Sequence, residues 1–163
     1  MNYIKTTKYD ISNGTGIRVV LWTAGCSHHC KGCHNPETWD ENSGKKFDES
    51  SLNELLNDLG KDYISGLTFS GGDPLYVNSR GTILKIAKAV KEKYHNKDIW
   101  LWTGYLWEDI CDLEILKYID VLIDGEFQLP LKDMRLKNRG SSNQRVIDVA
   151  KSLECGEVCL YCE

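Results

Sequence analysis

The sequence predicts an α/β fold built on a mostly parallel sheet, with helices packed outside it. Short apolar runs alternate with amphipathic stretches along the chain, which is the pattern of βαβ units. The apolar runs are nearly continuous, as in parallel strands that are buried on both faces. A segment rich in Cys, Gly or Asp follows each run, and parallel sheets bind ligands at the carboxyl ends of their strands. We therefore expect these segments to meet at one edge of the sheet.

The first strand is expected at residues 17–23, a run of β-branched and aromatic residues that follows the turn signal Asn13-Gly-Thr-Gly16. A polar loop continues from this strand to about Phe47. A loop of this length is uncommon in a compact domain unless it is functional. A helix is then expected from Asp48 or Ser50 to Gly60, because leucines recur in it at i, i+3, i+4 and i+7.

The rest of the chain repeats the alternation of strand and helix. The predicted elements are, in order, strand 66–70, helix 80–94, strand 98–102, helix 107–118 and strand 119–123. The three strands end at Gly71-Gly-Asp-Pro74, at Thr103 and at Asp124-Gly125. Two adjacent glycines allow the backbone to approach a ligand closely.

Three cysteines stand within eight residues directly after the first strand, at Cys26, Cys30 and Cys33. Soft thiolates at this density indicate a metal or iron–sulfur site. A structural zinc or an electron-transfer cluster normally takes four protein ligands, so three leave one coordination position for something other than protein. The alternative is part of a structural zinc site, completed by a histidine of the same loop or by a distant thiol. We expect none of the loop histidines to ligate iron.

Composition restricts the class of protein. The 163 residues predict one domain, over 1–163, and no composition break or repeat indicates a second. A net charge of −4 without a block of Lys and Arg argues against a nucleic acid partner. No apolar stretch approaches the roughly 18 residues of a membrane span, and seven cysteines crowded in two places suit a reducing compartment. A cytoplasmic protein is expected.

The cysteines Cys155, Cys159 and Cys162 in the tail 155–163 repeat the spacing of the first group. Residues 157–161 read as a short strand, which would hold Cys155 and Cys159 roughly 13 Å apart, too far to share one metal. Only a bend at Gly156 would bring them together. We interpret the repeat as coincidence, with zinc, an auxiliary cluster or thiol redox chemistry as the alternatives.

Cys26-x3-Cys30-x2-Cys33 followed by Ser70-Gly-Gly-Asp-Pro-Leu75 resembles the radical S-adenosylmethionine (SAM) superfamily, whose members share a full or partial (β/α)6 barrel. Further motifs in the same order resemble the activating enzymes of anaerobic (class III) ribonucleotide reductases. These motifs are Asn13-Gly-Thr-Gly16, His34-Asn-Pro-Glu-Thr-Trp39, Ile99-Trp-Leu-Trp-Thr-Gly-Tyr105, Val121-Leu-Ile-Asp-Gly125 and Arg139-Gly-Ser-Ser-Asn-Gln-Arg145. Gly32 departs from the wider superfamily, in which an aromatic residue usually precedes the third cysteine.

The resemblance implies a single [4Fe-4S] cluster with three irons on Cys26, Cys30 and Cys33 and the fourth chelated by SAM. Reduction of the cluster would cleave SAM to methionine and a 5′-deoxyadenosyl radical, which would generate a glycyl radical on the large subunit of an anaerobic ribonucleoside-triphosphate reductase. The electron would come from a low-potential donor such as flavodoxin or ferredoxin. The alternatives are an activase of another glycyl-radical enzyme, such as pyruvate formate-lyase, and a zinc-binding interaction module without enzymatic activity.

The expected SAM contacts follow from the same resemblance and from position. The backbone of Gly71 and Gly72 would pair with the amino-acid end of SAM, and Asp73 would help to attract its ammonium group. Residues next to the cluster in sequence, and residues that end the last two strands, complete the set. The expected cofactor contacts are Gly32, Cys33, His34, Gly71, Gly72, Asp73, Thr103 and Asp124.

Overall fold

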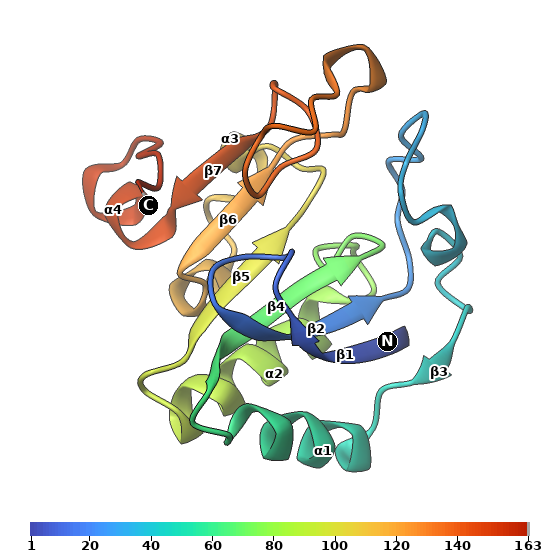
Figure 1. Cartoon of the computed structure of the whole chain (residues 1–163), viewed down its shortest axis with the longest axis vertical. Coiled ribbons are helices and arrows are strands. Elements are labelled where there is room, and N and C mark those ends of the chain that lie inside the picture. Colours follow the sequence, from blue (N-terminus) through green and yellow to red (C-terminus); the bar gives the residue numbers. More distant parts are fainter. Residues whose placement is uncertain (163) are drawn as a thin grey trace.

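A mixed sheet of seven strands runs through the computed structural model, which describes residues 1–162 (Figure 1). The strands are β1 (Asn2–Asp10), β2 (Ile17–Thr23), β3 (Lys45–Lys46), β4 (Ile64–Gly71), β5 (Asp98–Trp102), β6 (Val121–Asp124) and β7 (Arg145–Asp148). Their order across the sheet is β3-β1-β2-β4-β5-β6-β7. The four central strands β2, β4, β5 and β6 are parallel to one another. They are the four strands that the sequence predicts, and β2 and β5 have the predicted bounds.

Both edges of the sheet are antiparallel, which the sequence analysis did not predict. β1 pairs antiparallel with β2 and with β3, and β7 pairs antiparallel with β6. β1 lacks a continuous apolar run because much of its length is only half-buried. The fold is therefore α/β with a parallel centre, as predicted, inside a sheet that is mixed as a whole.

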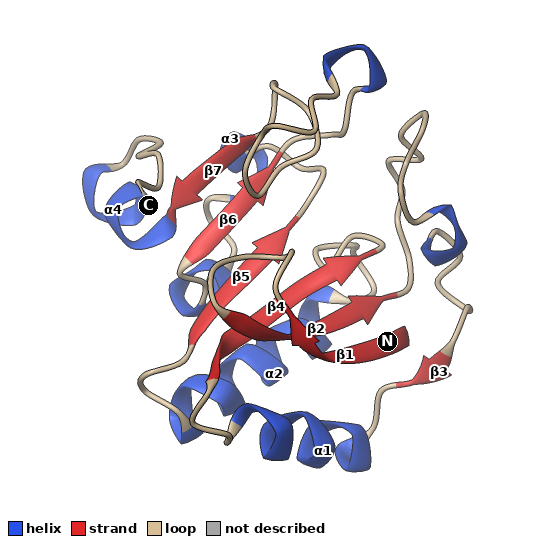
Figure 2. Ribbon diagram, viewed as in Figure 1, coloured by secondary structure: helices blue, strands red, loops and turns tan. Residues whose placement is uncertain are grey.

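The helices cover one face of this sheet (Figure 2). The helices are α1 (Glu49–Leu59), α2 (Arg80–Lys93), α3 (Trp107–Ile110) and α4 (Val149–Cys155), and the 3-10 turn η2 (Glu114–Tyr118) follows α3. Two further 3-10 turns, η1 (Pro36–Thr38) and η3 (Leu129–Leu131), lie in the loops after β2 and β6. The Asp48 carboxylate caps α1 by accepting the Ser51 N–H at 2.9 Å, as predicted. The single helix expected over 107–118 is wrong, because Leu113 adopts an extended conformation and separates α3 from η2. Among residues 1–162 no helix has both the length and the apolarity of a membrane crossing.

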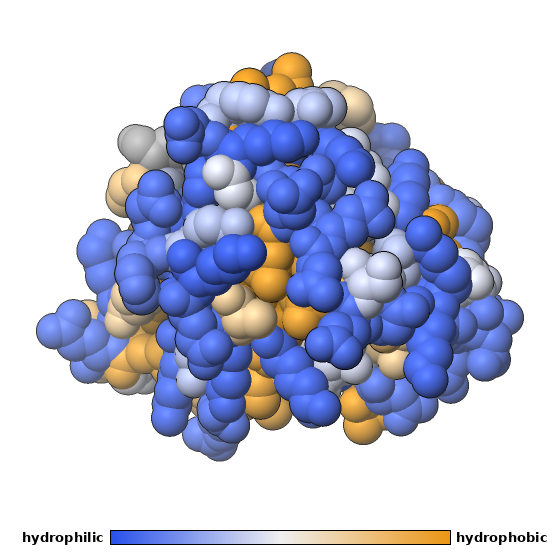
Figure 3. Space-filling view, turned by 90° about the horizontal axis from the view of Figure 1, so that it is seen from below, coloured by the Kyte–Doolittle hydropathy of each residue, from blue (hydrophilic) through white to orange (hydrophobic). Residues whose placement is uncertain are grey.

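The helix-covered face holds the main core. Side chains that alternate along the strands point toward the helices, and each fully buried aliphatic side chain contributes about 1.5–3 kcal/mol. The buried set includes Val19, Leu21, Leu67, Phe69 and Leu101 from the strands and Leu55, Leu59, Ile83, Ile86 and Val90 from α1 and α2. The surface seen from below is mostly hydrophilic, with apolar side chains showing only in narrow areas (Figure 3).

The opposite face carries a smaller apolar cluster and a buried charge. Trp100, Val121 and Ile123 are buried there, and Tyr161 of the tail packs edge-on against Trp100 with ring centroids 5.4 Å apart. Arg18 lies beside them with no exposed surface. Burial lowers the pKa of Arg18, and the nearby Asp98 carboxylate opposes this shift.

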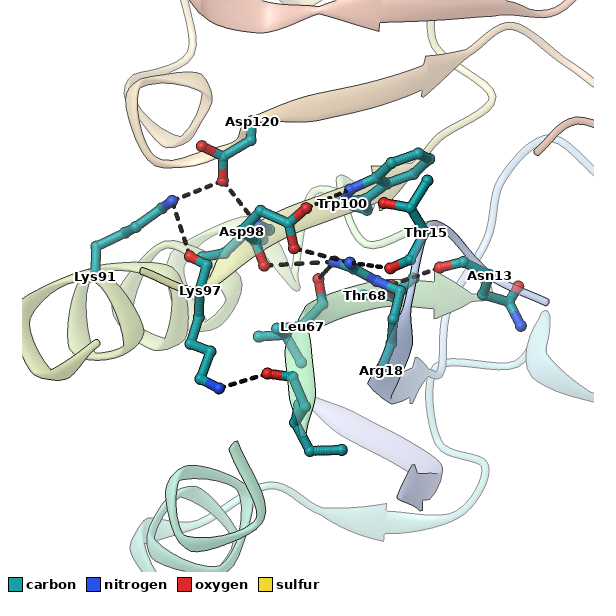
Figure 4. A network of polar contacts seen from close by, with 12 residues as sticks. Asn13, Thr15, Arg18, Leu67, Thr68, Lys91, Lys97, Asp98, Trp100 and Asp120 are labelled. Carbon is teal, nitrogen blue, oxygen red and sulfur yellow. Dashed lines mark hydrogen bonds and ion pairs between the residues drawn. The ribbon is translucent and has the colours of Figure 1, made fainter. Parts of the chain in front are cut away.

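Arg18 joins the N-terminal turn to two central strands (Figure 4). Its guanidinium donates to Asp98 Oδ1 at 2.8 Å, to Thr68 Oγ1 at 2.8 Å and to the Thr15 carbonyl at 3.1 Å. Thr68 in turn donates to the Asn13 carbonyl at 2.7 Å. This network holds the turn at residues 13–15 over the open face of the sheet.

The strand expected over 157–161 is wrong. Gly156 ends α4 in the left-handed conformation, with φ 75°, and turns the chain back on itself. The tail then runs beside β7, where Leu160 forms an isolated antiparallel bridge with Ile147. The bend that the sequence analysis named as a condition for bringing Cys155 and Cys159 together is therefore present.

Candidate active site

A cavity of about 510 Å³ opens at the carboxyl ends of the parallel strands. The arrowheads of β2, β4, β5 and β6 point to one end of the molecule, where the loops that follow β2 and β6 also lie (Figure 1). Segments from the ends of all four strands line the cavity, as the sequence predicts. The predicted site residues in its wall are Cys26, Cys30, Cys33, His34, Gly71, Gly72, Asp73 and Thr103.

Backbone hydrogen bonds close the cysteine loop on itself. Gly25 N–H donates to the Thr38 carbonyl at 2.8 Å, and Cys26 N–H donates to the Trp39 carbonyl at 3.0 Å. A second turn forms where Cys33 N–H donates to the Cys30 carbonyl at 3.0 Å. These hydrogen bonds hold the start of the loop against residues 38 and 39, and all three cysteines line one cavity.

The chemistry of the three thiols fits an iron–sulfur cluster. Burial raises the pKa of Cys26 and of Cys30, so a bound cation is needed to hold them as thiolates at neutral pH. The Asn35 N–H donates to Cys33 Sγ at 3.4 Å, a contact that orients this sulfur within the loop. Within residues 1–162 no group of three His, Cys, Asp or Glu is arranged around a single metal ion. A four-iron cluster takes each thiolate on a different iron, so its ligands do not need to meet at one point.

The Gly71-Gly72-Asp73 turn packs against the start of the cysteine loop. Gly72 N–H donates to the Thr23 carbonyl at 2.9 Å, and Asp73 N–H donates to the Gly25 carbonyl at 2.8 Å. A Cβ on Gly72 would lie 2.5 Å from Gly25 O and 2.9 Å from Thr38 O. The adjacent protein backbone therefore requires glycine here, in addition to the close approach of a ligand that the sequence predicts.

Asp73 is buried and links three segments of the site. Its Oδ1 accepts from Leu75 N–H at 2.8 Å, and Thr103 Oγ1 donates to both carboxylate oxygens at 2.9 Å. Its Oδ2 also accepts from Gly104 N–H at 2.9 Å. The carboxylate thus fixes the ends of β4 and β5 relative to each other.

His28 connects this carboxylate to the cysteine loop, and the sequence analysis treated it only as a polar loop residue. Its Nε2 lies 2.8 Å from Asp73 Oδ2 and its Nδ1 lies 2.9 Å from Glu126 Oε1. The Asp73 carboxylate raises the pKa of His28 above its ordinary value, and Glu126 adds to the rise. An imidazolium donates from both nitrogens, which suits a ring held between two carboxylates.

Two predicted cofactor contacts, Asp124 and Gly32, lie outside the cavity wall. Asp124 is fully buried, and its carboxylate accepts from Trp107 N–H at 2.8 Å and from Arg145 Nε at 3.0 Å. Gly125, the next residue, lines the cavity instead. Gly32 has φ 77° and faces Leu129, whose Cδ1 would lie 3.1 Å from an added Cβ.

The cavity wall also contains residues that were not predicted as cofactor contacts. They come from the N-terminal turn, the cysteine loop and the segment after β6, and they are Ser12, Asn13, Trp39, Phe127, Met134, Arg139 and Gln144. Asn13, Trp39, Arg139 and Gln144 fall in motifs that the resemblance had singled out. Their position in these motifs was the feature of the sequence that could have identified them, because none of these residue types indicates ligand binding by itself.

Comparison with known proteins agrees with this geometry. Residues 12–147 match the family model described as a 4Fe-4S single cluster domain. The chain is 49% identical over 146 residues to the anaerobic ribonucleoside-triphosphate reductase-activating protein of Enterobacteria phage T4, which covers 90% of this chain and 93% of the relative.

Two bacterial proteins of the same name are also similar. The Pasteurella multocida protein is 43% identical over 150 residues, with 88% of this chain and 95% of the relative covered. The Escherichia coli K12 protein is 41% identical over 150 residues, with 90% and 97% covered. The chain therefore belongs to the family of anaerobic ribonucleoside-triphosphate reductase-activating proteins.

Proposed function

We propose that this chain activates an anaerobic ribonucleoside-triphosphate reductase by generating a glycyl radical on its large subunit. The observation that carries the proposal is the convergence of three cysteines, the Gly-Gly-Asp turn and Thr103 on one cavity. The names of the relatives supply the identity of the partner.

Cys26, Cys30 and Cys33 would each hold one iron of a [4Fe-4S] cluster, and the cavity beside them would receive SAM. When bound and reduced, the cluster supplies the electron that cleaves SAM to methionine and a 5′-deoxyadenosyl radical. Gly32, Cys33 and His34 form the part of the loop nearest this ligand in sequence. The His34 ring packs against Phe127, with ring centroids 5.1 Å apart, and would bound the cavity on that side.

The Gly-Gly-Asp turn suits the amino-acid end of SAM. The Gly72 N–H donates to the Thr23 carbonyl, and Gly72 itself lies in the cavity wall. A carbonyl in the wall of a cavity is a good acceptor for an ammonium group. Asp73 would add negative charge and hold the turn, and Gly71 with its φ of 105° would set the direction of the turn.

Thr103 and Asp124 would act on SAM through other groups. Thr103 donates to Asp73 from the end of β5. Asp124 binds Arg145, which continues into the loop of Arg139 and Gln144 in the cavity wall. We propose Thr103 as a direct or Asp73-mediated contact, and Asp124 as a residue that positions this wall.

The finer architecture belongs to the same proposal. Four parallel strands, with β1 and β3 on one flank and the antiparallel β7 on the other, are consistent with a partial (β/α)6 barrel made by one domain over residues 1–163. The loop after β6 carries exposed apolar side chains at Leu129, Leu131 and Met134, and Met134 is 82% exposed at the cavity wall. A glycine-bearing loop of the reductase would enter here, since a reactive radical needs its hydrogen donor close and water excluded. The electron would come from a flavodoxin or ferredoxin, in the cytoplasm.

The test is reconstitution without oxygen. The chain with iron, sulfide, SAM, a low-potential reductant and an anaerobic ribonucleoside-triphosphate reductase is expected to give a glycyl radical doublet in electron paramagnetic resonance, with 5′-deoxyadenosine formed alongside. Deuterium placed at the glycine Cα is expected to appear in 5′-deoxyadenosine. The assignment fails if the label is not transferred, or if only another glycyl-radical enzyme such as pyruvate formate-lyase is activated.

A further inference from the structure

The β6–β7 loop, residues 125–144, supplies part of the cavity wall and carries positive charge beyond it. It lies at the end of the sheet to which the parallel strands point (Figure 1). Its central part, residues 129–139, contains four cationic side chains and one carboxylate, although the whole chain has a net charge of −4. The cations are Lys132, Arg135, Lys137 and Arg139, and the first three are exposed.

Asp133, the carboxylate of this segment, holds Arg135 in one orientation. Arg135 Nε donates to Asp133 Oδ1 at 3.0 Å and Arg135 Nη2 donates to Asp133 Oδ2 at 2.8 Å. The Arg135 side chain is nevertheless 90% exposed. A guanidinium has five N–H donors, so this ion pair fixes the group and leaves donors directed to solvent.

Apolar side chains are exposed among these cations. Leu129 and Leu131 are 42% and 40% exposed, and Met134 is 82% exposed. A single exposed apolar side chain needs no explanation, but three within six residues form a patch with a charged rim, which is typical of protein interfaces. Methionine is unbranched and adapts its shape to a partner surface.

Hydrogen bonds connect the two halves of the β6–β7 loop, so this patch is already formed in the free chain. Ser142 N–H donates to the Leu131 carbonyl at 2.9 Å, and Asp133 N–H donates to the Gly140 carbonyl at 3.3 Å. The buried Gln144 accepts from Gly140 N–H at 2.9 Å at the base of the loop. A segment that is ordered before binding loses less conformational entropy when a partner binds.

The β6–β7 loop also packs on the cysteine loop. Leu129 Cδ1 would lie 3.1 Å from a Cβ added to Gly32, and the Phe127 ring lies 5.1 Å from that of His34. Met134 is both exposed and part of the cavity wall. A protein bound to the exposed part of this loop is therefore placed beside the cavity in which the radical would form.

We propose that the β6–β7 loop recognises an acidic surface of the reductase, adjacent to its glycine-bearing loop. This inference rests on the proposed function, because it takes the partner to be the protein that supplies the glycine. Leu131 and Met134 would be buried at the centre of the contact, and Lys132 and Arg135 would face carboxylates around it. Opposite charges steer the encounter and fix the orientation of the partner, which directs the radical to one glycine.

The test changes the charge of the loop without changing the cavity wall. Neither Lys132 nor Arg135 is among the described residues that line the cavity. Rates of glycyl radical formation are measured against reductase concentration, with dithionite as a small reductant in place of a protein donor. Lys132→Glu with Arg135→Gln is expected to raise the half-maximal reductase concentration at least about fivefold at low salt, and less than about twofold near roughly 0.5 M salt, because salt screens exposed charges.

Lys85→Glu with Lys117→Gln is the matched control. It makes the same change in net charge at exposed lysines of α2 and η2, and it is expected to leave the half-maximal concentration unchanged. Leu131→Ser tests the apolar part and is expected to raise this concentration about threefold or more at every salt concentration. Its control is Leu153→Ser on α4, since Leu153 is 41% exposed and Leu131 is 40% exposed.

Formation of 5′-deoxyadenosine without the reductase separates this inference from the proposed function. It is expected to be the same in all four variants and in the unchanged protein. If the unchanged protein forms no glycyl radical, the proposed function fails and this inference fails with it. If the unchanged protein forms the radical but the two charge variants do not differ at low salt, only the acidic surface is excluded.

Three other results would also overturn the inference. A charge effect seen only when flavodoxin replaces dithionite would assign the β6–β7 loop to the electron donor. A dimer of this chain that the loop variant dissociates would assign it to a second copy. Loss of reductase-independent SAM cleavage in the loop variant would assign Lys132 and Arg135 to the SAM site.

Discussion

The two cysteine groups of this chain have the same spacing in the sequence but different structural surroundings. The first follows a central parallel strand and faces a cavity of about 510 Å³, and its loop is closed by backbone bonds from Gly25 and Cys26. The second begins at the last residue of the short helix α4, beyond the last antiparallel strand, and two of its three cysteines are exposed. The first group therefore has room for a ligand beside its thiols, while no cysteine of the second lines either cavity of the described residues. The same cysteine spacing therefore does not predict the same role, because only the first group lies beside a cavity at the carboxyl ends of the parallel strands.

Replacing cysteines gives the largest expected difference between the groups. Cys26→Ala, Cys30→Ala or Cys33→Ala is expected to abolish SAM cleavage, because a cluster left with two protein ligands is not held. Cys155→Ala, Cys159→Ala and Cys162→Ala are expected to leave cleavage near that of the unchanged protein. Iron content and 5′-deoxyadenosine are measured after anaerobic reconstitution. If the unchanged protein instead bound stoichiometric zinc and no iron at Cys26, Cys30 and Cys33, the first group would not be a cluster site.

Substitutions of Gly72 and Gly156 test how the backbone positions the first and the second cysteine group. Gly72→Ala places a Cβ 2.5 Å from Gly25 O, and displacing the cysteine loop is expected to cost about 1–3 kcal/mol and to lower iron incorporation. Gly156→Ala meets open space but keeps φ 75°, so it is expected to cost about 1–2 kcal/mol and leave iron incorporation unchanged. Denaturant unfolding and iron analysis measure both effects.

Gly81→Ala is the control for this pair, because its added Cβ meets no atom within 4 Å and α2 favours alanine by about 1 kcal/mol. Normal iron loading and impaired SAM binding in Gly72→Ala would show that a ligand, and not the loop, requires this glycine.

His28 tests the connection between the first group and the Asp73 carboxylate. His28→Ala removes hydrogen bonds to two carboxylates, and bonds of this type contribute about 1.5–3 kcal/mol each. We expect SAM affinity to fall about tenfold or more, which corresponds to at least about 1.4 kcal/mol, with iron content retained. Calorimetric titration of SAM into the reconstituted protein measures this, with His95→Ala as the exposed-histidine control. Equal SAM affinities of His28→Ala and His95→Ala would show that His28 does not contribute to SAM binding.

Asp148 gives the smallest expected effect and concerns the second group. Its carboxylate caps α4 by accepting Lys151 N–H at 3.1 Å, and its interaction with the Lys151 side chain lowers its pKa below the ordinary 3.8. Because the folded pKa is below the unfolded one, this stabilisation is complete above about pH 4 and is lost as the pH falls through the folded value.

Asp148→Ala is expected to cost about 0.5–2 kcal/mol at neutral pH, and the difference from the unchanged protein should vanish in acid. Thermal unfolding across the pH range measures this. A difference that persists at the acid end would mean that the carboxylate does not act as an ionised cap.

The central strands could be predicted because they are buried on both faces. Val19 to Leu21 and Ile99 to Leu101 are fully buried, and such runs are visible in the sequence. β1 and β7 were missed because their half-buried positions break the apolar run. The helix at 107–118 was overextended because periodicity does not show that Leu113 leaves the helical conformation.

The part of the candidate site that could be predicted is the part in which the residue type itself indicates the chemical role. The three cysteines and Asp73 could be named, because thiols and a carboxylate beside two glycines are rare enough to indicate a role. The placement of His28 between Asp73 and Glu126 depends on residues 45 and 98 positions away, which periodicity cannot join. The bend at Gly156 was recognised only as a condition, since glycine permits a left-handed turn without requiring one.

Arg18 has a consequence for the order in which the chain folds during synthesis. Its side-chain partners Thr68 and Asp98 follow it by 50 and 80 residues. The network that anchors the turn at residues 13–15 is therefore incomplete until Asp98 has left the ribosome, and the cavity wall at Ser12 and Asn13 assembles late. Nascent chains stalled before Asp98 should be cut by protease near residues 13–15, while chains long enough to expose residues 98–102 outside the exit tunnel should resist.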